Sequence, residues 1–458
     1  MDIARLNTLM QADADHHLHP NTNPRAVVRD GAMVITGGDG IRITDENGKT
    51  YIEGLAGLWC CSLGFSEERL VRAAERQLRQ LPYYHSFVGR VPAPTARLAH
   101  ALAQIAPVPI SRFFFASSGS EANDTAIKMA WYYNNALGRP KKKKIMSRLN
   151  SYHGLTVAAA SLTYLAAHQN GFDVPLAGFV KVDCPHFYRF GRDGESEEQF
   201  VDRLAESLED TILKEGPDTI AAFFAEPVQG AGGILVPPRG YFQRIQQILR
   251  KYDILFIVDE VICGFGRTGR MFGSDTFDLK PDLMTMAKGL SAGYQPISAV
   301  GMSEAVYEAI ADLGNANGTF GHGFTYGGHP VAAAVALETL DIYRERDIVG
   351  HVQSVSPHFQ NRLQAFRDHD LVGEVRGVGL LGAIELVADK ASGEGFDPAL
   401  GIGNKVLAGA AARGLLFRAA GNTLLFCPPL IVSTADIDDI FDIVTLALDD
   451  VAKAIGRA

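Results

Sequence analysis

Short runs of consecutive apolar residues alternate with longer amphipathic segments through the middle of the chain. The apolar runs are 112–116, 144–147, 220–225, 254–258 and 282–287, and the segments with helical spacing between them include 120–136, 198–214 and 239–251. A strand that is apolar at every position is buried on both faces, and such strands separated by helices are typical of a mostly parallel sheet. The pattern therefore predicts an α/β protein with helices on both faces of that sheet.

The two ends of the chain have a different pattern. Residues 33–53 read as short strands separated by glycine turns, and 67–81 and 94–105 have apolar positions at helical spacing. The C-terminal part of the chain indicates a smaller α+β unit. Its segments are a glycine-rich apolar stretch at 375–387, a helix at 402–413, a strand at 423–427 and an amphipathic helix at 434–455. We place the boundary between the two units near residue 335, in or before a long helix that starts at Pro330.

The composition narrows the class of protein. A chain of 458 residues is too long for one core, so two or more packed units are expected. A net charge of −9 argues against a nucleic-acid-binding protein, and no apolar run is long enough to span a membrane. The N-terminus lacks the pattern of a signal peptide, and the five scattered cysteines lack zinc-ligand spacing. We expect a cytoplasmic protein without a metal, and we attribute the histidines at 16, 17 and 19 to a mobile segment.

Residues 264–269 have the spacing of a dinucleotide-binding turn, Gly-x-Gly-x-x-Gly. Such a turn starts directly at the end of a strand and opens a helix. Here five residues separate the apolar run from Gly264, and the segment that follows Gly269 contains Gly273 and Pro281 and has no helical period. We therefore expect a loop that folds back over the protein, and a nicotinamide-dependent oxidoreductase is the less favoured alternative.

Two ionisable residues follow apolar runs. Asp259 comes directly after 254–258, and Lys288 comes directly after 282–287. Open α/β sheets bind ligands at the carboxyl ends of their strands. Burial of a lysine is costly unless the amine is neutral or covalently used, and a lysine with a lowered pKa is suited to forming a Schiff base.

Two further motifs add to this pair. Ser118, Gly119 and Ser120 stand between a strand and a helix start, which suits a phosphate group, although Ser118 with Glu121 is also an ordinary capping box. Tyr152 follows another strand and offers an aromatic face. A lysine, an aspartate for a pyridinium nitrogen, a helix N-terminus and an aromatic ring together describe a site for pyridoxal 5'-phosphate.

From about Leu58 to its C-terminus the chain resembles the class III, or omega, aminotransferases. The most specific segments are FIVDEVICGFGRTG and PDLMTMAKGLSAG, and ASSGSEAND, SYHG, AEPVQGAGG, HGFTYGGHP and RGVGLL occur in the family's order. The resemblance implies the type I pyridoxal phosphate fold, with a large domain at 71–335 and a smaller α+β domain formed by residues 1–70 and 336–458. It implies transfer of an amino group from an amine or omega-amino acid to a keto acid, with pyruvate as the acceptor, by a ping-pong Schiff-base mechanism in a homodimer or tetramer.

The resemblance also implies roles for individual residues. Lys288 is the Schiff-base lysine, Asp259 pairs with the ring nitrogen, and Tyr152 and Val261 cover the two faces of the ring. Glu226 stands beside Asp259, and His153 lies in a cofactor-binding loop, where it serves as hydrogen-bonding scaffold. Ser118, Gly119 and Ser120 bind the phosphate, which Thr325 reaches from the neighbouring subunit. Arg418 binds a substrate carboxylate, and Trp59, Phe87 and Ala231 wall the substrate pocket.

Two positions depart from the family pattern. Members that act on ornithine or 4-aminobutyrate usually carry glutamate where this chain has Ala231, and many have glutamine in place of Ile262. Both changes make the pocket more apolar, which argues against ornithine and favours monoamines or donors similar to β-alanine or taurine. The motifs alone also leave open a decarboxylase or an aminomutase that uses the same cofactor, and a catalytically silent binding protein.

Overall fold

The computed structural model describes residues 3–107 and 109–457, with side chains from residue 9 onward. Its centre is a seven-stranded sheet. In sheet order the strands are β4 (Ile110–Ala116), β10 (Ser298–Ser303), β9 (Leu283–Met286), β8 (Leu255–Asp259), β7 (Ile220–Ala225), β5 (Lys144–Arg148) and β6 (Phe179–Val182). Neighbouring strands are parallel except that β10 runs antiparallel to both β9 and β4. The prediction of a mostly parallel sheet is confirmed.

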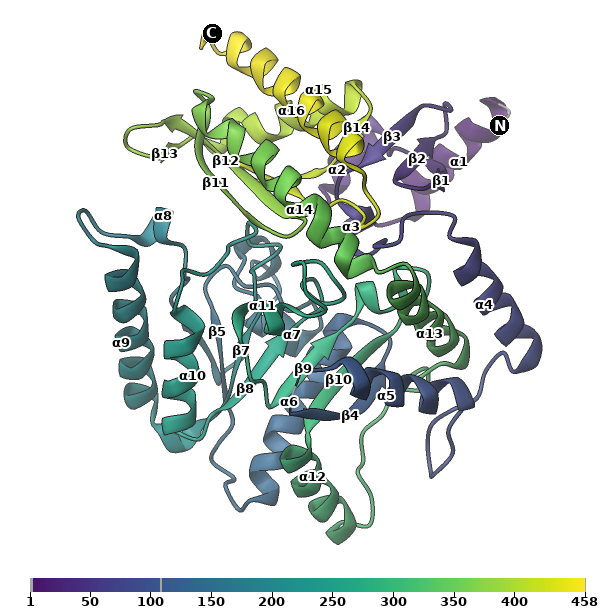
Figure 1. Cartoon of the computed structure of the whole chain (residues 1–458), viewed down its shortest axis with the longest axis vertical. Helices are drawn as coiled ribbons and strands as arrows, with labels where there is room; N and C mark the ends of the chain where they lie inside the picture. The colour runs from purple at the N-terminus through teal and green to yellow at the C-terminus, as the bar shows by residue number, and fades with distance from the viewer. Residues whose placement is uncertain (1–2, 108, 458) are drawn as a thin grey trace.

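Helices cover both faces of this sheet (Figure 1). One face packs against α9 (Glu197–Glu215) and α10 (Tyr241–Lys251), and the other packs against α6 (Gly119–Ala136) and α12 (Glu304–Ala316). Phe223 and Phe224 are adjacent in β7 and both fully buried, yet they belong to the separate cores on the two faces. Successive side chains of a strand point in opposite directions, so a doubly covered strand must be apolar at every position.

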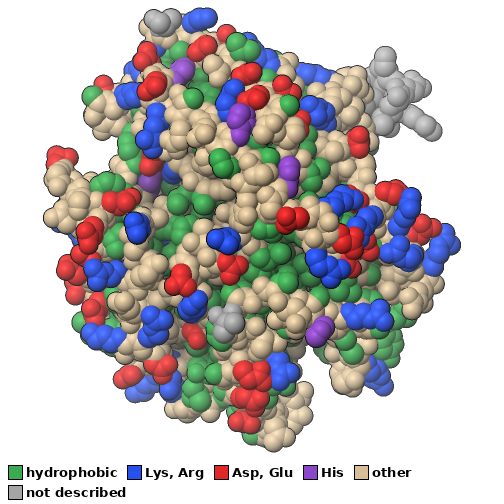
Figure 2. Space-filling view, in the orientation of Figure 1, with side chains coloured by type: hydrophobic (Ala, Val, Ile, Leu, Met, Phe, Trp, Pro, Cys, Tyr) green, Lys and Arg blue, Asp and Glu red, His purple; other side chains and the backbone are tan. Residues whose placement is uncertain are grey.

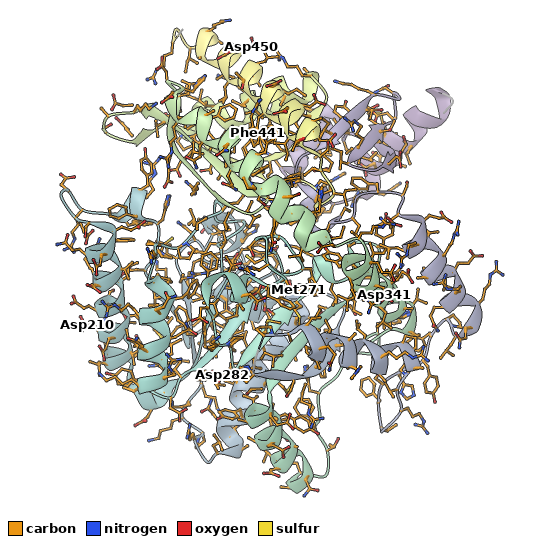
Figure 3. All side chains as sticks on the ribbon, in the orientation of Figure 1. Asp210, Met271, Asp282, Asp341, Phe441 and Asp450 are labelled. Atoms are coloured by element: carbon orange, nitrogen blue, oxygen red, sulfur yellow. The ribbon has the colours of Figure 1, made fainter. Side chains whose placement is uncertain are left out.

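A second unit lies above the large sheet in Figure 1. Its sheet contains β11 (Val372–Val378), β12 (Leu381–Asp389), β16 (Thr423–Phe426) and β15 (Arg418–Ala420), with β13 (Glu394–Gly395) paired to β12. It is covered by α14 (Ile348–Gln364), α15 (Ile402–Ala412) and α16 (Thr434–Ala454). Phe441 of α16, labelled in Figure 3, packs its ring against those of Phe359, Phe366 and Phe426.

The two ends of the chain meet in a small four-stranded sheet. It consists of β1 (Ile35–Asp39), β2 (Arg42–Asp45) and β3 (Thr50–Glu53), with β14 (Leu415–Leu416) paired in parallel to β3. The remaining helices are α1 (Ile3–His16), α2 (Pro24–Asp30), α3 (Ala56–Trp59), α4 (Glu68–Gln80), α5 (Ala93–Ile105), α7 (Val157–Leu162), α8 (Phe187–Phe190), α11 (Gly273–Phe277) and α13 (Pro330–Glu345). The helix expected from Pro330 is therefore present as α13.

The structure refines the sequence pattern near residue 379. The apolar stretch at 375–387 is divided between two antiparallel strands, β11 and β12, because Gly379 adopts a φ of 59° and reverses the chain. Gly379 also lies so close to the carbonyl oxygen of Arg267 that an added Cβ would be 2.4 Å from it. Glycine is required here both for the turn and for this contact.

Although the chain has a net negative charge, its surface carries many basic side chains as well as acidic ones. On the face drawn in Figure 2, basic and acidic side chains are interspersed, most densely where α4 carries the ion pairs Arg72–Glu68 and Arg79–Glu75. Among the described residues, no helix combines the length and apolarity that crossing a membrane would need.

Candidate active site

A cavity of about 520 Å³ opens at the carboxyl ends of β8 and β9, a size typical of small-molecule sites. Its walls come from segments far apart in the sequence. Of the residues predicted for the site, those that line this cavity are Trp59, Gly119, Ser120, Tyr152, His153, Glu226, Ala231, Asp259, Val261, Lys288 and Arg418. The fold thus brings most of the predicted site together in one place.

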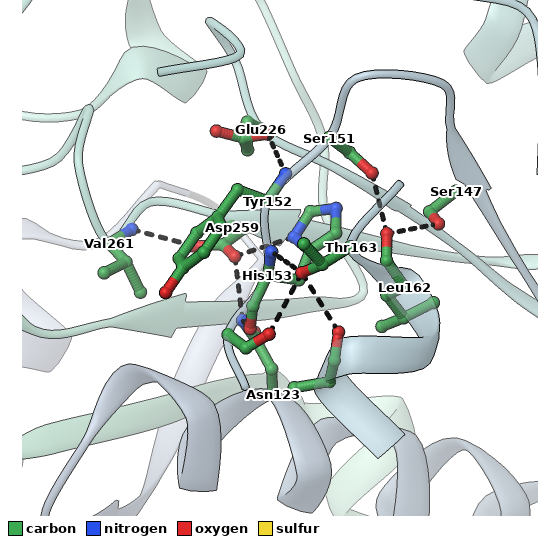
Figure 4. A network of polar contacts seen from close by, with 12 residues as sticks. Asn123, Ser147, Ser151, Tyr152, His153, Leu162, Thr163, Glu226, Asp259 and Val261 are labelled. Carbon is green, nitrogen blue, oxygen red and sulfur yellow. Dashed lines mark hydrogen bonds and ion pairs between the residues drawn. The ribbon is translucent and has the colours of Figure 1, made fainter. Parts of the chain in front are cut away.

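Asp259 is the last residue of β8 and is only 4% exposed. One carboxylate oxygen accepts a hydrogen bond from Asn123 Nδ2 at 2.8 Å and contacts His153 Nδ1 at 2.8 Å, while the other accepts from the backbone N–H of Val261 at 3.0 Å (Figure 4). Burial raises the pKa of this carboxyl, but the hydrogen bonds and the charge of His153 outweigh burial and leave the pKa below its ordinary value. Asp259 is therefore held in its ionised form.

Lys288 follows β9, and its ammonium nitrogen lies 5.2 Å from the centre of the Trp59 ring. Its backbone φ is 45°, in the left-handed region that strains a residue with a side chain. Burial lowers the pKa of the Lys288 amine, against smaller opposite effects of Cys60 and Asp259. The amine is therefore easier to deprotonate than that of a surface lysine.

The N-terminus of α6 forms another wall of the cavity. Ser118 is the N-cap, with its hydroxyl accepting from the Glu121 N–H at 3.2 Å, so the capping box noted in the sequence is present. The first backbone hydrogen bond of the helix joins Ala122 N to Ser118 O, so the N–H groups of Gly119 and Ser120 precede the helical ladder. A Cβ on Gly119 would lie 3.2 Å from Val261, which explains why glycine stands here.

Tyr152 is tied to the site through its backbone. Its N–H donates to Glu226 Oε1 at 3.0 Å (Figure 4), and the other Glu226 oxygen accepts from Gly230 N at 2.8 Å. Burial raises the pKa of Glu226 and is only partly opposed by the nearby charge of His153. Glu226 and Asp259 thus present two carboxyl groups whose pKa values are shifted in opposite directions.

Trp59 is presented by an unusual backbone conformation. Ala56, Gly57, Leu58 and Trp59 have φ values of 50°, 58°, 84° and 61°, so the turn labelled α3 is left-handed. Left-handed conformation costs a residue with a side chain about 1–2 kcal/mol. Strain of this kind is concentrated at functional sites, where the surrounding packing holds it in place. The sequence contains no distinct signal for this turn.

Arg418 begins β15 and reaches the cavity from the C-terminal unit. Its guanidinium lies 5.7 Å from the centre of the Trp59 ring, and no carboxylate among the described residues is within ion-pair distance of it. Ala231 and Ile262, the two positions that depart from the family pattern, both line the cavity. The cavity therefore combines a cation that lacks a protein counterion with apolar walls.

Three predicted residues do not line this cavity. Ser118 lies just outside it as the cap of α6. Phe87 and Thr325 belong to two loops that contact one another, since Tyr83 Oη donates to the Thr325 carbonyl at 2.8 Å and a Cβ on Gly323 would meet the Phe87 ring at 2.8 Å. The Phe87 side chain is 42% exposed.

The glycine motif is confirmed as a loop. Only the five-residue helix α11 follows it, and Arg267 within it donates to the carbonyl of Pro428 in the C-terminal unit. The loop is held by Glu260, a fully buried residue that the sequence reasoning did not single out. Its carboxyl accepts from Gly273 N at 2.9 Å and from the hydroxyl of Ser274 at 2.6 Å.

The pH dependence of the free energy of unfolding should show that Glu260 is protonated in the folded protein below about pH 7. Burial raises the pKa of this carboxyl to about 7, despite the hydrogen bonds from Ser274 and Gly273. Between about pH 4.5 and pH 7 the folded protein holds a proton that the unfolded chain has released, so this group's contribution to the free energy of unfolding falls by about 3 kcal/mol as pH rises through that window. Urea unfolding at several pH values should give a flatter profile for Glu260→Gln than for the wild type.

The matched control is Glu304→Gln. Glu304 is exposed and its hydrogen bond with Arg112 lowers its pKa, so it titrates below this window. Its removal should leave the profile between pH 4.5 and pH 7 parallel to that of the wild type. A Glu260→Gln profile that also runs parallel to the wild type would contradict the assignment.

Comparisons with known proteins identify the family of the chain. The family model for class-III aminotransferases matches residues 26–448. A gamma aminobutyrate transaminase of Solanum lycopersicum, named as chloroplastic, is 51% identical over 92% of this chain and 82% of its own, and a mitochondrial one of Oryza sativa is 49% identical over 93% and 83%. The crystal structure of an omega transaminase from Pseudomonas jessenii in complex with PMP has a TM-score of 0.97 and 52% identity, covering 98% of this chain and 99% of its own.

The chain therefore belongs to the class-III aminotransferase family. It is an enzyme that transfers amino groups with pyridoxal 5'-phosphate as its cofactor, and it has the type I fold of these enzymes. The residues present fit that cofactor. Besides a lysine, an ionised carboxylate and a helix N-terminus, buried polar atoms without a hydrogen-bond partner among the described residues include Asn123 Oδ1, His153 Nε2 and Trp59 Nε1.

Proposed function

We propose that the enzyme moves an amino group from an amine or omega-amino acid to a keto acid, with pyruvate as the acceptor, in two ping-pong half-reactions. The observation that carries this proposal is the presence of Lys288, ionised Asp259 and the N-terminus of α6 around one cavity. Pyridoxal phosphate supplies an aldehyde that condenses with amines and a ring that accepts electrons. The protein supplies orientation, proton transfer and fixed charge.

Lys288 is the proton carrier in this proposal. Burial lowers the pKa of its amine, so a neutral Nζ is accessible and can take a proton from the α-carbon of the substrate. The same Nζ would then hold that proton and release it again, so that one side chain would serve as both base and acid. Its approach over the Trp59 ring restricts where the amine can move. Lys288 would also be the residue that holds the cofactor's aldehyde group, because a neutral amine is a nucleophile.

Asp259 is proposed to hold the ring nitrogen in its protonated form. The carboxylate is kept ionised by the contacts with His153, Asn123 and the Val261 N–H, so its negative charge is available to the cofactor. Glu226, whose pKa is raised by burial, adds a second polar group beside it. Tyr152 and Val261 would cover the two faces of the ring.

The phosphate is proposed to bind at the start of α6. The N–H groups of Gly119 and Ser120 and the positive end of the helix dipole attract an anion there. The hydroxyls of Ser118 and Ser120 add donors, although both already accept hydrogen bonds, from Glu121 N and from Leu155 N. Thr325 would complete this site from a second subunit.

A homodimer accounts for the two predicted residues that lie away from the cavity. The loops that carry Phe87 and Thr325 expose a cluster of large apolar side chains, namely Tyr83, Tyr84, Phe87, Val88, Val91 and Tyr326. Contiguous exposed apolar side chains are typical of a protein interface. If this surface meets a second copy of the chain, Phe87 and Thr325 can enter the neighbouring active site.

The donor is proposed to be either an omega-amino acid, such as 4-aminobutyrate, or an apolar amine. Among the described residues that line the cavity, Arg418 and Lys288 are the two lysine or arginine side chains, so Arg418 is the one available to bind a substrate carboxylate. Ala231 and Ile262 leave room for apolar groups. The curated relatives are gamma aminobutyrate transaminases, which favours the first donor class. A matching omega transaminase variant with a tryptophan, a phenylalanine and an arginine replaced was engineered for synthesis of bulky amines. This fits pocket roles for Trp59, Phe87 and Arg418.

Arg418→Ala should separate the two donor classes. Loss of a charge-assisted hydrogen bond to a carboxylate costs about 1.5–3 kcal/mol, which corresponds to ~10–10²-fold in affinity. We expect KM for 4-aminobutyrate and for pyruvate to rise by this factor, and the half-reaction with an apolar monoamine to change little. Arg413→Ala, which removes an exposed arginine paired with Asp450, is the control. Equal loss for both donors would exclude a carboxylate-binding role.

The reaction type itself is tested by separate half-reactions of the purified enzyme. A donor amine without an acceptor should bleach the bound cofactor once per active site, and pyruvate should restore its colour. Release of carbon dioxide, or product formed without a keto acid, would point instead to a decarboxylase or an aminomutase on the same fold.

We further propose that the domains are 71–335 and, as a second unit, 1–70 with 336–458, which the pairing of β14 with β3 supports. A cytoplasmic location is also proposed. All five cysteines are free thiols, as in a reducing compartment. Plant relatives carry mitochondrial or chloroplastic names, so cell fractionation is the deciding measurement.

A further inference from the structure

Three side chains of types that can ligate a metal ion meet near the N-terminus, at the end of α1 in the upper right of Figure 1. One oxygen of Asp13 lies 2.9 Å from His17 Nδ1, and its other oxygen lies 2.7 Å from His19 Nε2. The three potential ligand atoms all lie within 4.8 Å of one another, and the two imidazole rings are 4.3 Å apart. Two imidazoles and a carboxylate are a donor set that Zn²⁺ and related ions prefer.

The local sequence explains this arrangement. Asp13 and His17 are four residues apart, which places them on one face of a helical turn, and the His17 N–H still bonds to the Asp13 carbonyl at 2.9 Å. The chain then leaves the helix, and His19 folds back toward the same carboxylate. The neighbouring His16 is the last residue of α1 and is not part of the cluster.

We propose that Asp13, His17 and His19 bind a divalent transition-metal ion, with Zn²⁺ as the probe, and that the ion fixes the segment beside the active site. Bonds of about 2.1 Å that meet at a tetrahedral angle separate ligand atoms by roughly 3.4 Å. The two separations between Asp13 oxygens and histidine nitrogens need to widen by about 0.5–0.7 Å, which partly exposed side chains can accommodate. Water completes the coordination.

The second group of this kind in the described residues is a poorer candidate. His186, Glu374 and Glu385 also bring their ligand atoms together. However, Arg376 bonds to both of those carboxylates, and Arg189 bonds to Glu385 as well. These guanidinium groups already occupy the place and supply the charge that a metal ion would bring. At Asp13, by contrast, the two histidines are the only ion-pair partners among the described side chains.

The proposed metal site lies directly beside the active-site cavity. Pro20 and Asn21, directly after His19, line the active-site cavity. An ion that joins α1 to His19 holds this short connection in place. Metal binding is therefore expected to restrain the segment 17–22 and one wall of the cavity, whatever the preferred substrate is.

The test uses the holoenzyme freed of metal with a chelator. Titration with ZnCl₂, followed by calorimetry, should give one tight site per chain in the wild type. Removal of a ligand in His17→Ala or His19→Ala should weaken that site by at least roughly 10²-fold. His16→Ala, a neighbouring histidine outside the cluster, should bind as the wild type does. His16 and His17 are exposed and His19 is partly buried, and thermal melts should confirm that each variant folds.

Thiols are the main competing ligands, because the chain has five free cysteines. Co²⁺ in place of Zn²⁺ should give the spectrum of nitrogen and oxygen ligands without a thiolate charge-transfer band. Unchanged affinity in both His17→Ala and His19→Ala, an equal loss in His16→Ala, or a thiolate band at the tight site would overturn the metal site. Hydrogen exchange at 17–22 should slow with Zn²⁺ in the wild type and in His16→Ala but not in His17→Ala or His19→Ala, and an unchanged rate in the wild type would overturn the restraint on the cavity wall.

Discussion

Lys288→Ala is expected to lower kcat by ~10⁴-fold, the upper end of what a positioned acid–base group contributes. The substitution removes the amine that carries the proton between substrate and cofactor, and it also removes the covalent attachment of the cofactor. The purified variant should therefore lose the absorption band of lysine-bound pyridoxal phosphate. Steady-state rates with pyruvate as acceptor, together with the visible spectrum, measure the two effects separately.

Two further variants show whether the loss is specific. Lys288→Arg keeps the positive charge but lacks a readily deprotonated amine, so it should be as inactive as alanine. Lys142→Ala removes another lysine that is only 4% exposed and whose ammonium donates to the carbonyls of Tyr252 and Asp253. That change should reduce stability and leave the spectrum and turnover intact. Retention of wild-type turnover in Lys288→Ala would show that the assignment is wrong.

The apolar runs predicted the central sheet well because doubly covered strands leave little choice of residue. The run 220–225 coincides with β7, and the other runs differ from their strands by one or two residues. The antiparallel strand β10 was not recognised, since its sequence SAVGMS is short and rich in small residues. Helix α14 was also missed, in a segment that is interrupted by Pro357.

The chemistry of the site was more predictable than its geometry. Asp259 and Lys288 could be found because strand ends mark ligand sites in open α/β sheets. Asn123 could not, because its amide acts only after α6 and β8 pack together. Asp259 and Glu260 are adjacent in sequence, yet one faces the cavity and the other holds the glycine loop. Successive residues at a strand end point in opposite directions, so only one of a pair can reach the ligand.

Asp259→Asn is the second substitution with a large expected effect. The amide is nearly the same size as the carboxylate, so the contacts with Asn123 and His153 can largely persist while the charge is lost. An ion pair at about 4 Å in a partly screened site is worth about 4 kcal/mol. We therefore expect kcat/KM to fall by ~10³-fold, because a ring nitrogen that loses its proton draws electrons less strongly.

The control for this change is Asp282→Asn. Asp282, labelled in Figure 3, lies just before β9, at the opposite end of the strand from the cavity, where its carboxylate accepts from Phe256 N at 2.8 Å. Its replacement tests whether losing any carboxylate beside this sheet lowers the rate, and we expect stability to change while kcat/KM does not. A cofactor analogue methylated on the ring nitrogen carries a permanent positive charge and needs no carboxylate to keep it. This analogue should restore a large part of the rate in Asp259→Asn, and failure to do so would mean that Asp259 acts through the structure of the site and not through its charge.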